Sequence, residues 1–263
     1  MKMFFKRIIS ALLFLTASEQ SLQRSDPGRF ARLGGAIMLL SIAVGVVLAG
    51  MWNLTSHVTW VFWSGMLNYW VVSSLVCGSA IVFGFYRQSA SVLIESAVGR
   101  SRLGLWVGPV LLAAGVAVIL YYAFRQSNPD WPTQLPRQWG WLWPRPLCRV
   151  LILSPVWGAW SMIVLVQFHR PDERTDPPTR RFAETVSPFR SAVCLAVPLA
   201  GTLIFLNFLH PWRHFIPPAS AVATALAAGT LIVRRRGMMS RKTLLATNLL
   251  TQLGFLAAYM SVR

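Results

Sequence analysis

Acidic residues are scarce in this chain, which carries 8 Asp and Glu against 25 Lys and Arg and has a formal net charge of +17. Its long apolar stretches contain almost no carboxylate. A membrane enzyme that acts on phosphates usually needs carboxylates to hold a metal, because hard cations prefer oxygen ligands. The scarcity of acids therefore argues against metal-dependent phosphate chemistry.

Cysteine is also rare, and the 3 residues present show no paired spacing. Cys77, Cys148 and Cys194 lie within or at the edge of apolar stretches, so they predict neither a disulfide framework nor a zinc site. His210 and His214 have the i,i+4 spacing of a helical metal site, but a proline separates them and no carboxylate is near. The chain also lacks a Gly-rich phosphate loop and a nucleophile elbow. We expect no catalytic residue, no metal ligand and no cofactor.

Apolar residues, in contrast, make up 55% of the chain, and the mean hydropathy is +0.52. This content argues against a soluble fold. A run of about 20 apolar residues crosses the hydrocarbon core of a bilayer as a helix, and several runs reach that length. We predict an all-α, polytopic transmembrane helix bundle of about seven spans. The expected spans are residues 33–52, 58–86, 103–124, 147–168, 191–209, 217–233 and 243–260.

The N-terminal segment, residues 1–32, is basic and precedes a single transmembrane helical domain, residues 33–263. Its first part combines basic residues with a short apolar stretch. Both cleaved signal peptides and amphipathic helices at the membrane surface have this pattern. The stretch is too short to span a bilayer, and further arginines follow it. We therefore favour a retained interfacial helix.

Basic residues alternate in abundance between successive loops, and cytoplasmic loops of membrane proteins carry the excess of Lys and Arg. We predict a multi-pass protein of a bacterial-type plasma (inner) membrane, with a cytoplasmic N-terminus and an outer C-terminus. Because the charges flank membrane segments, anionic lipid headgroups are the expected partner, and nucleic acid is not. The basic residues expected outside are Arg125, Arg137, Arg145, Arg149, Arg213 and Arg263.

Two stretches in expected cytoplasmic loops carry recognisable motifs. Residues 237–252 read GMMSRKTLLATNLLTQ, and residues 100–104 read RSRLG. In order and spacing they resemble two patterns of the cobalamin-5′-phosphate synthases (adenosylcobinamide-GDP ribazoletransferases), which are polytopic membrane enzymes of similar length. The first resembles Gly-Gly-x-Thr-Gly-Asp followed by Gly-Ala-x-x-Glu-x-x-Glu, and the second resembles Asp-Ser-Arg-x-Gly. Gly84 lies at the distance before Ser101 where the family has the closing Gly of a further acidic motif.

The chain departs from this family at the acidic positions. The Asp of each pattern falls on Arg100 or Lys242, and the two Glu fall on Leu249 and Gln252. The family's Asp clusters are expected to bind Mg²⁺ and the pyrophosphate of adenosylcobinamide-GDP. A cationic side chain cannot ligate Mg²⁺, but it can stabilise a phosphate directly. The candidate binding residues are Arg100, Ser101, Arg102, Gly237, Ser240, Arg241 and Lys242.

Two classes of function follow. The first is a non-catalytic membrane protein on a synthase-like scaffold, which binds a phosphorylated or lipid ligand, alone, as a homo-oligomer or with a membrane protein partner. The second is an active transferase whose Mg²⁺ is held by other acids. Glu95 is the one carboxylate outside the evident polar loops, and both a solvated and a functional role stay open for it. A third alternative is a transporter or an accessory subunit.

Overall fold

The structure, a computed structural model, describes residues 2–16, 30, 33–62, 89, 93, 114–115, 118, 146–169, 171–173, 175–206 and 212–262. All regular secondary structure in this part of the chain is helical, as predicted. Five of these helices are long and apolar enough to cross a membrane. The expected spans 58–86 and 103–124 lie almost entirely outside the described residues, so the number seven stays a prediction. The five helical segments are Gly34–Trp52, Cys148–Phe168, Pro188–Phe205, Arg213–Arg236 and Arg241–Ser261.

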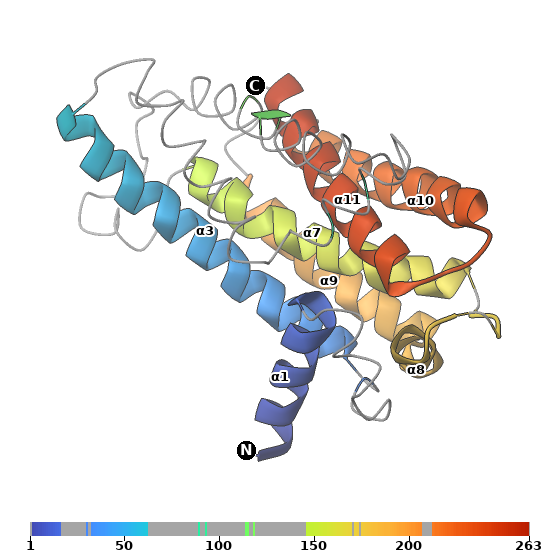
Figure 1. Cartoon of the computed structure of the whole chain (residues 1–263). Helices are drawn as coiled ribbons and strands as arrows, with labels where there is room; N and C mark the ends of the chain where they lie inside the picture. Colours follow the sequence, from blue (N-terminus) through green and yellow to red (C-terminus); the bar gives the residue numbers. More distant parts are fainter. Residues whose placement is uncertain are drawn as a thin grey trace.

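One helix, α7 (Pro146–Phe168), lies at the centre of the described bundle. It packs against α3 (Gly34–Phe62), α9 (Pro188–Phe205), α10 (Ile216–Arg236) and α11 (Arg241–Ser261), as Figure 1 shows. Of its spanning segment 89% is buried inside the protein, against 17% for α9. An apolar helix surface without a polar face is typical of a helix enclosed by others. The remaining helices are therefore arranged around α7.

Small residues allow α3 to approach α7 closely. The two helices run antiparallel, because Gly34 faces Ile163 near one end and Gly45 faces Ile152 towards the other. A Cβ atom placed on Gly45 would lie 2.6 Å from the carbonyl oxygen of Ile152 and 2.7 Å from its Cα. Glycine at a helix crossing in a membrane lets two backbones pack against each other. The α3–α7 contact is of this kind.

Polar side chains lie in the contact between α7 and α11. Asn248 Nδ2 donates a hydrogen bond to Met162 Sδ at 3.6 Å, and Gln252 Nε2 donates one to Asn248 Oδ1 on the same helix. A Cβ atom on Gly158 would lie 2.6 Å from Asn248 Oδ1, so α7 leaves room here for the two amides. Such contacts hold membrane helices in register.

The outer helices are tied to the bundle by hydrogen bonds. Trp157 Nε1 of α7 donates to Thr202 Oγ1 of α9 at 3.0 Å, and that hydroxyl donates to the carbonyl of Pro198 at 2.7 Å. On α10, Ser220 Oγ donates to the carbonyl of Gly254 in α11 at 3.1 Å. A buried polar group without a partner is costly in lipid, so these pairs fix how the helices lie against one another.

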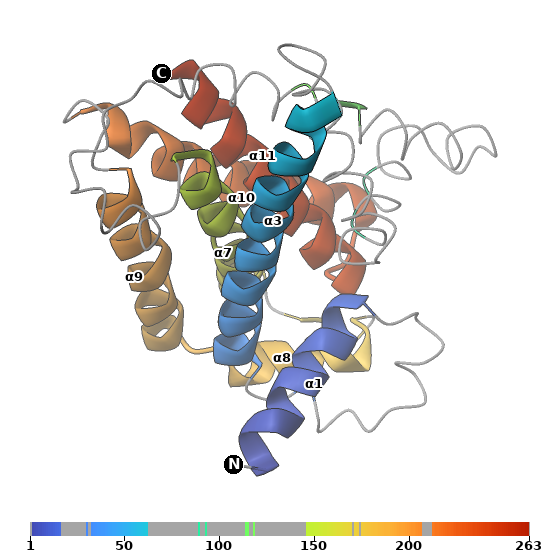
Figure 2. The same cartoon turned by 90° about the vertical axis from the view of Figure 1, so that its left-hand side faces the viewer.

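Two helical segments differ from the sequence-based expectation. Helix α3 continues to Phe62, through the polar stretch 53–57 that was expected to form a loop. That stretch contains neither glycine nor proline, so nothing in it stops a helix. The short helix α8 (Pro177–Thr185) was not expected within its polar loop; Figure 2 shows it lying across one end of the bundle, and the short η3 (Arg213–Phe215) precedes α10.

The N-terminal helix α1 (Lys2–Thr16) is docked on the bundle at its C-terminal half. Ala11 and Phe14 are fully buried and belong to the main hydrophobic core. The Phe14 ring lies 6.1 Å from the Phe30 ring and 5.6 Å from the Phe182 ring of α8, measured between centroids. The helix expected at the N-terminus is present; its position at a membrane surface stays a prediction.

Candidate functional site

The basic residues are sorted between the two ends of the bundle. At one end, Arg149 and Arg213 donate hydrogen bonds to the carbonyls of Phe205 and Val262, each at 3.4 Å. The opposite end, called the basic end below, holds the C-termini of α7 and α10 and the N-termini of α9 and α11. This sorting agrees with the one expected from the loop charges, and which end faces the cytoplasm stays a prediction. The basic end carries Lys6, Arg7, Arg180, Arg181, Arg190, Arg234, Arg235, Arg236, Arg241 and Lys242.

Four of the candidate binding residues lie where α10 connects to α11: Gly237 and Ser240 in the turn, and Arg241 and Lys242 at the start of α11. Gly237 ends α10 in the left-handed conformation, with φ +67°, and its N–H donates to the Arg234 carbonyl at 3.3 Å. Ser240 precedes α11 and forms a capping box with Thr243. The Ser240 N–H donates to Thr243 Oγ1 at 2.9 Å, and the Thr243 N–H donates to Ser240 Oγ at 3.3 Å. Gly237 and Ser240 therefore define the turn.

Replacing Gly237 with alanine is expected to lower the free energy of unfolding by about 1 kcal/mol, because an L-residue with a Cβ is strained at this φ. Among the described residues, no atom lies within 4 Å of a Cβ placed on Gly237, so the expected cost is conformational. Gly237→Asn should lose less, since Asn tolerates the left-handed region. Denaturant titration in detergent micelles measures both. Equal stability of Gly237→Ala and the wild type would contradict the expectation.

A single carboxylate joins the starts of two helices at the basic end. Asp176 Oδ2 accepts the N–H of Thr179 at 3.1 Å and so caps α8, while Asp176 Oδ1 accepts the N–H of Arg241 at 2.9 Å at the start of α11. Negative charge is favoured at helix N-termini. This role was not predicted from the sequence, although Asp followed by Pro177 and Pro178 is a typical helix-start pattern.

Arg241 is buried, with only 5% of its surface exposed. Its Nε donates a hydrogen bond to the carbonyl of Phe14 near the end of α1, and its guanidinium carbon lies 5.9 Å from the centroid of the Phe14 ring. No sequence pattern indicated this contact, because the two residues are far apart in the chain. Arg241 therefore connects α11 to α1. Its neighbour Lys242 is half-buried at the start of α11.

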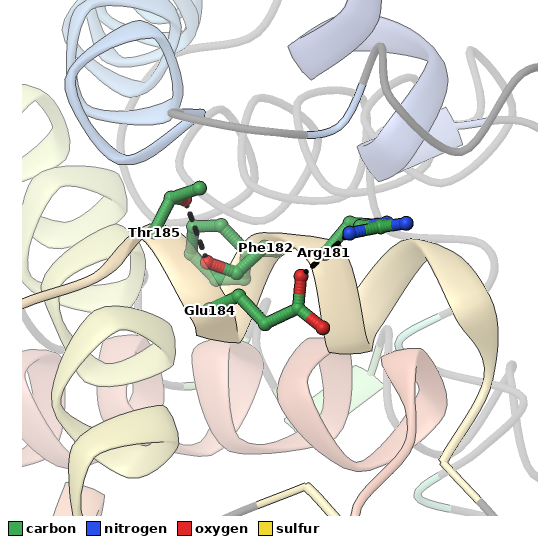
Figure 3. A network of polar contacts seen from close by, with 4 residues as sticks. All are labelled: Arg181, Phe182, Glu184 and Thr185. Atoms are coloured by element: carbon green, nitrogen blue, oxygen red, sulfur yellow. Dashed lines mark hydrogen bonds and ion pairs between the residues drawn. The ribbon is translucent and has the colours of Figure 1, made fainter.

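Two basic residues of the α8–α9 corner, Arg181 and Arg190, have side-chain partners within the corner itself. Arg181 Nη1 forms an ion pair with Glu184 Oε2 at 3.0 Å, and Thr185 Oγ1 donates to the Phe182 carbonyl at 2.9 Å (Figure 3). Arg190 Nη1 donates to the carbonyl of Thr185 at 2.6 Å. An exposed ion pair contributes little to stability but offsets part of the local positive charge.

The C-terminus of α10 is different, because Arg234 and Arg235 are exposed there. Between the described residues, the one ion pair is that of Arg181 and Glu184, so neither arginine is neutralised by a described carboxylate. His169 directly follows α7, and its Nε2 atom lies 3.3 Å from Thr230 Oγ1 of α10. Burial, and then the charge of Arg234, lower the pKa of His169 below its ordinary value. The smaller of these two effects shows that the positive charge of Arg234 acts on the neighbouring imidazole.

The second stretch of the candidate site, residues 100–102, lies outside the described residues. Arg100, Ser101 and Arg102, together with Gly84 and Glu95, lie outside the described residues, so their convergence with the α10–α11 turn stays a prediction. Within the described part of the chain, no three His, Cys, Asp or Glu residues gather where they could hold a metal ion. No family model, curated protein or solved structure matches the chain.

Proposed function

We propose that the chain is a membrane-embedded binding protein, which holds a phosphate-bearing ligand at its basic end without catalysing its conversion. The ligand carries a phosphate or pyrophosphate group, either on a free molecule or on an anionic lipid headgroup. One observation carries the proposal: Arg234 and Arg235, at the C-terminus of α10, are both exposed and are not neutralised by described carboxylates. Arginine is well suited to phosphate because its planar guanidinium donates paired hydrogen bonds.

The rigid α10–α11 turn supports this assignment. Gly237 ends α10, the Ser240–Thr243 capping box starts α11, and Asp176 accepts the first N–H of that helix. In the proposal Arg241 fixes the turn through its contact with α1, while the arginines before the turn and Lys242 after it face the ligand. Binding groups held in place before the ligand arrives lose less conformational entropy on binding.

The resemblance to cobalamin-5′-phosphate synthases agrees with this role. Lys242 stands where that family has an Asp of its C-terminal pattern, and Gln252 stands where it has a Glu. The proposal therefore assigns charge stabilisation of the phosphate to side-chain cations in place of a metal ion. Arg100 and Arg102 would add to the same site if the two stretches converge.

Binding is tested with the full chain in lipid nanodiscs. In zwitterionic phosphatidylcholine discs, inorganic pyrophosphate is titrated and its heat of binding measured by calorimetry. In discs containing phosphatidylglycerol, native mass spectrometry counts the anionic lipids that stay bound. Binding of pyrophosphate indicates a free phosphorylated ligand, and retention of phosphatidylglycerol alone indicates a lipid. The absence of both overturns the proposal.

The double variant Arg234→Gln, Arg235→Gln is expected to weaken binding by about tenfold per arginine, because each charge-assisted hydrogen bond contributes about 1.5 kcal/mol or more. The matched control is Arg180→Gln, Arg181→Gln, which removes the same charge from α8 at the same end. Equal weakening by both variants would indicate attraction to net charge alone and no defined site. Mg²⁺-dependent joining of α-ribazole to adenosylcobinamide-GDP by membranes that contain the chain would overturn the non-catalytic assignment.

A further inference from the structure

The outer face of α1 has no partner in the described bundle. Phe5, Ile9 and Leu12 are spaced by four and three residues, so they lie on one face of the helix. Their exposed fractions are 57%, 55% and 39%. A contiguous row of exposed large apolar side chains marks a surface that is covered by something else.

The opposite face of α1 is fixed to the bundle. Ser10, Ala11 and Phe14 are buried, and they share a face by the same spacing rule. The Phe14 carbonyl accepts the hydrogen bond of Arg241, and its ring packs on Phe182. The docked face sets the direction in which the apolar face points, so α1 is not a loose tail.

The depth of α1 relative to the spanning helices follows from the residues that it contacts. It packs against α3 and contacts Arg241, the first residue of the spanning helix α11. In Figure 2 it lies beside α8, at the end of the bundle where α3 begins. The starts of spanning helices lie near lipid headgroups. A 15-residue helix is only about 22 Å long, which is too short to cross a hydrocarbon core of about 30 Å.

The charge of α1 indicates what kind of surface covers its exposed apolar face. The helix carries Lys6 and Arg7 beside the apolar residues and contains no carboxylate. Basic residues next to an apolar face are typical of helices that lie in anionic membrane interfaces. The other residues of the basic end are also positively charged, so an anionic bilayer surface complements the charge of α1 and of the basic end.

We propose that α1 is retained in the mature protein and lies in the headgroup region of the protein's own anionic bilayer, with Phe5, Ile9 and Leu12 facing the lipid. Removal of α1 as a signal peptide would uncover the rings of Phe182 and Phe30 and take away the carbonyl to which Arg241 donates. The proposal does not depend on phosphate binding at the α10–α11 turn.

The test places an environment-sensitive nitrobenzoxadiazole dye on a single cysteine at Ile9→Cys, in a chain whose Cys77, Cys148 and Cys194 are replaced by alanine. The full chain is reconstituted in nanodiscs of phosphatidylglycerol with lipids brominated near the headgroup. We expect a blue-shifted emission and at least twofold quenching. A matched control carries the dye at Glu173→Cys, an exposed position of the α7–α8 loop, where the emission should stay that of a wet dye.

Several outcomes would overturn the proposal. Quenching at Ile9→Cys no stronger than at Glu173→Cys would show that the face is not in lipid. A disulfide cross-link between two copies of Ile9→Cys would show that a second copy covers it. A mature chain whose mass lacks the first residues would show that α1 is cleaved. Each labelled variant is compared with its unlabelled parent by gel filtration, so that misfolding is recognised directly.

Discussion

Replacement of Gly45 with alanine is expected to lower the free energy of unfolding by about 3 kcal/mol, because the added methyl group overpacks the contact between α3 and α7. The added Cβ would meet the carbonyl oxygen, the Cα and the carbonyl carbon of Ile152 at 2.6, 2.7 and 3.0 Å. All three are backbone atoms of α7, so no side-chain rotation can relieve the contact. The helix α3 must move away from α7, and the packing along both helices is then lost.

Gly50 provides the matched control on the same helix, because no atom of the described residues lies within 4 Å of a Cβ placed there. Gly50→Ala is expected to leave stability unchanged or to raise it by up to about 1 kcal/mol, since alanine favours the helix over glycine. Titration with sodium dodecyl sulfate in mixed micelles, followed by tryptophan fluorescence, measures both variants. Similar stability of the two would show that α3 does not pack on α7 at Gly45.

Replacement of Arg241 with alanine is expected to lower the free energy of unfolding by about 3 kcal/mol. The change leaves the buried Phe14 carbonyl without the donor that Arg241 Nε provides, removes the cation beside the Phe14 ring and opens a cavity where the side chain lies. Because the contact joins α11 to α1, the N-terminal helix should separate first. Limited proteolysis, read by the loss of α1, distinguishes this local change from global unfolding.

Lys242→Ala is the control for Arg241→Ala, because it removes the same charge from the adjacent position. A half-buried surface lysine contributes within about 0.5 kcal/mol, so its α1 should stay protected from protease. Equal protease sensitivity of the two variants would mean that net charge at the basic end, and not the Arg241–Phe14 contact, holds α1. Comparison of the two alanine variants therefore shows whether the Arg241–Phe14 contact or the net charge of the basic end holds α1 on the bundle.

The apolar runs were sufficient to predict the five described helices that are long and apolar enough to cross a membrane, because a stretch such as that of α7 has one stable state in lipid. Sorting of basic residues between the two ends was predictable for the same reason: charge at helix termini follows the membrane. The start of α8 could have been found from Asp176 and the two prolines after it. Local sequence patterns thus indicate some element boundaries, such as the start of α8, but the end of α3 at Phe62 was not predicted from them.

Contacts between segments that are distant in the chain could not be predicted from the sequence. Arg241 looks like an ordinary surface cation in the sequence, and only the docking of α1 places the Phe14 carbonyl beside it. Asp176 was assigned to a polar loop, although it also serves a helix start 65 residues away. Both contacts depend on segments distant in the chain, for which a single sequence contains no pairing signal.

The central position of α7 has a consequence for biosynthesis. Ribosomes deliver α3 to the membrane long before α7, yet the glycine face of α3 is complete only when α7 lies against it. During that interval Gly34 and Gly45 present bare backbone to lipid or to the insertion machinery. Helices α9, α10 and α11 leave the ribosome after α7, so they meet a surface that already exists. The close contact between α3 and α7 can therefore form only after α7 has been synthesised, whereas α9, α10 and α11 can dock on α7 as they emerge.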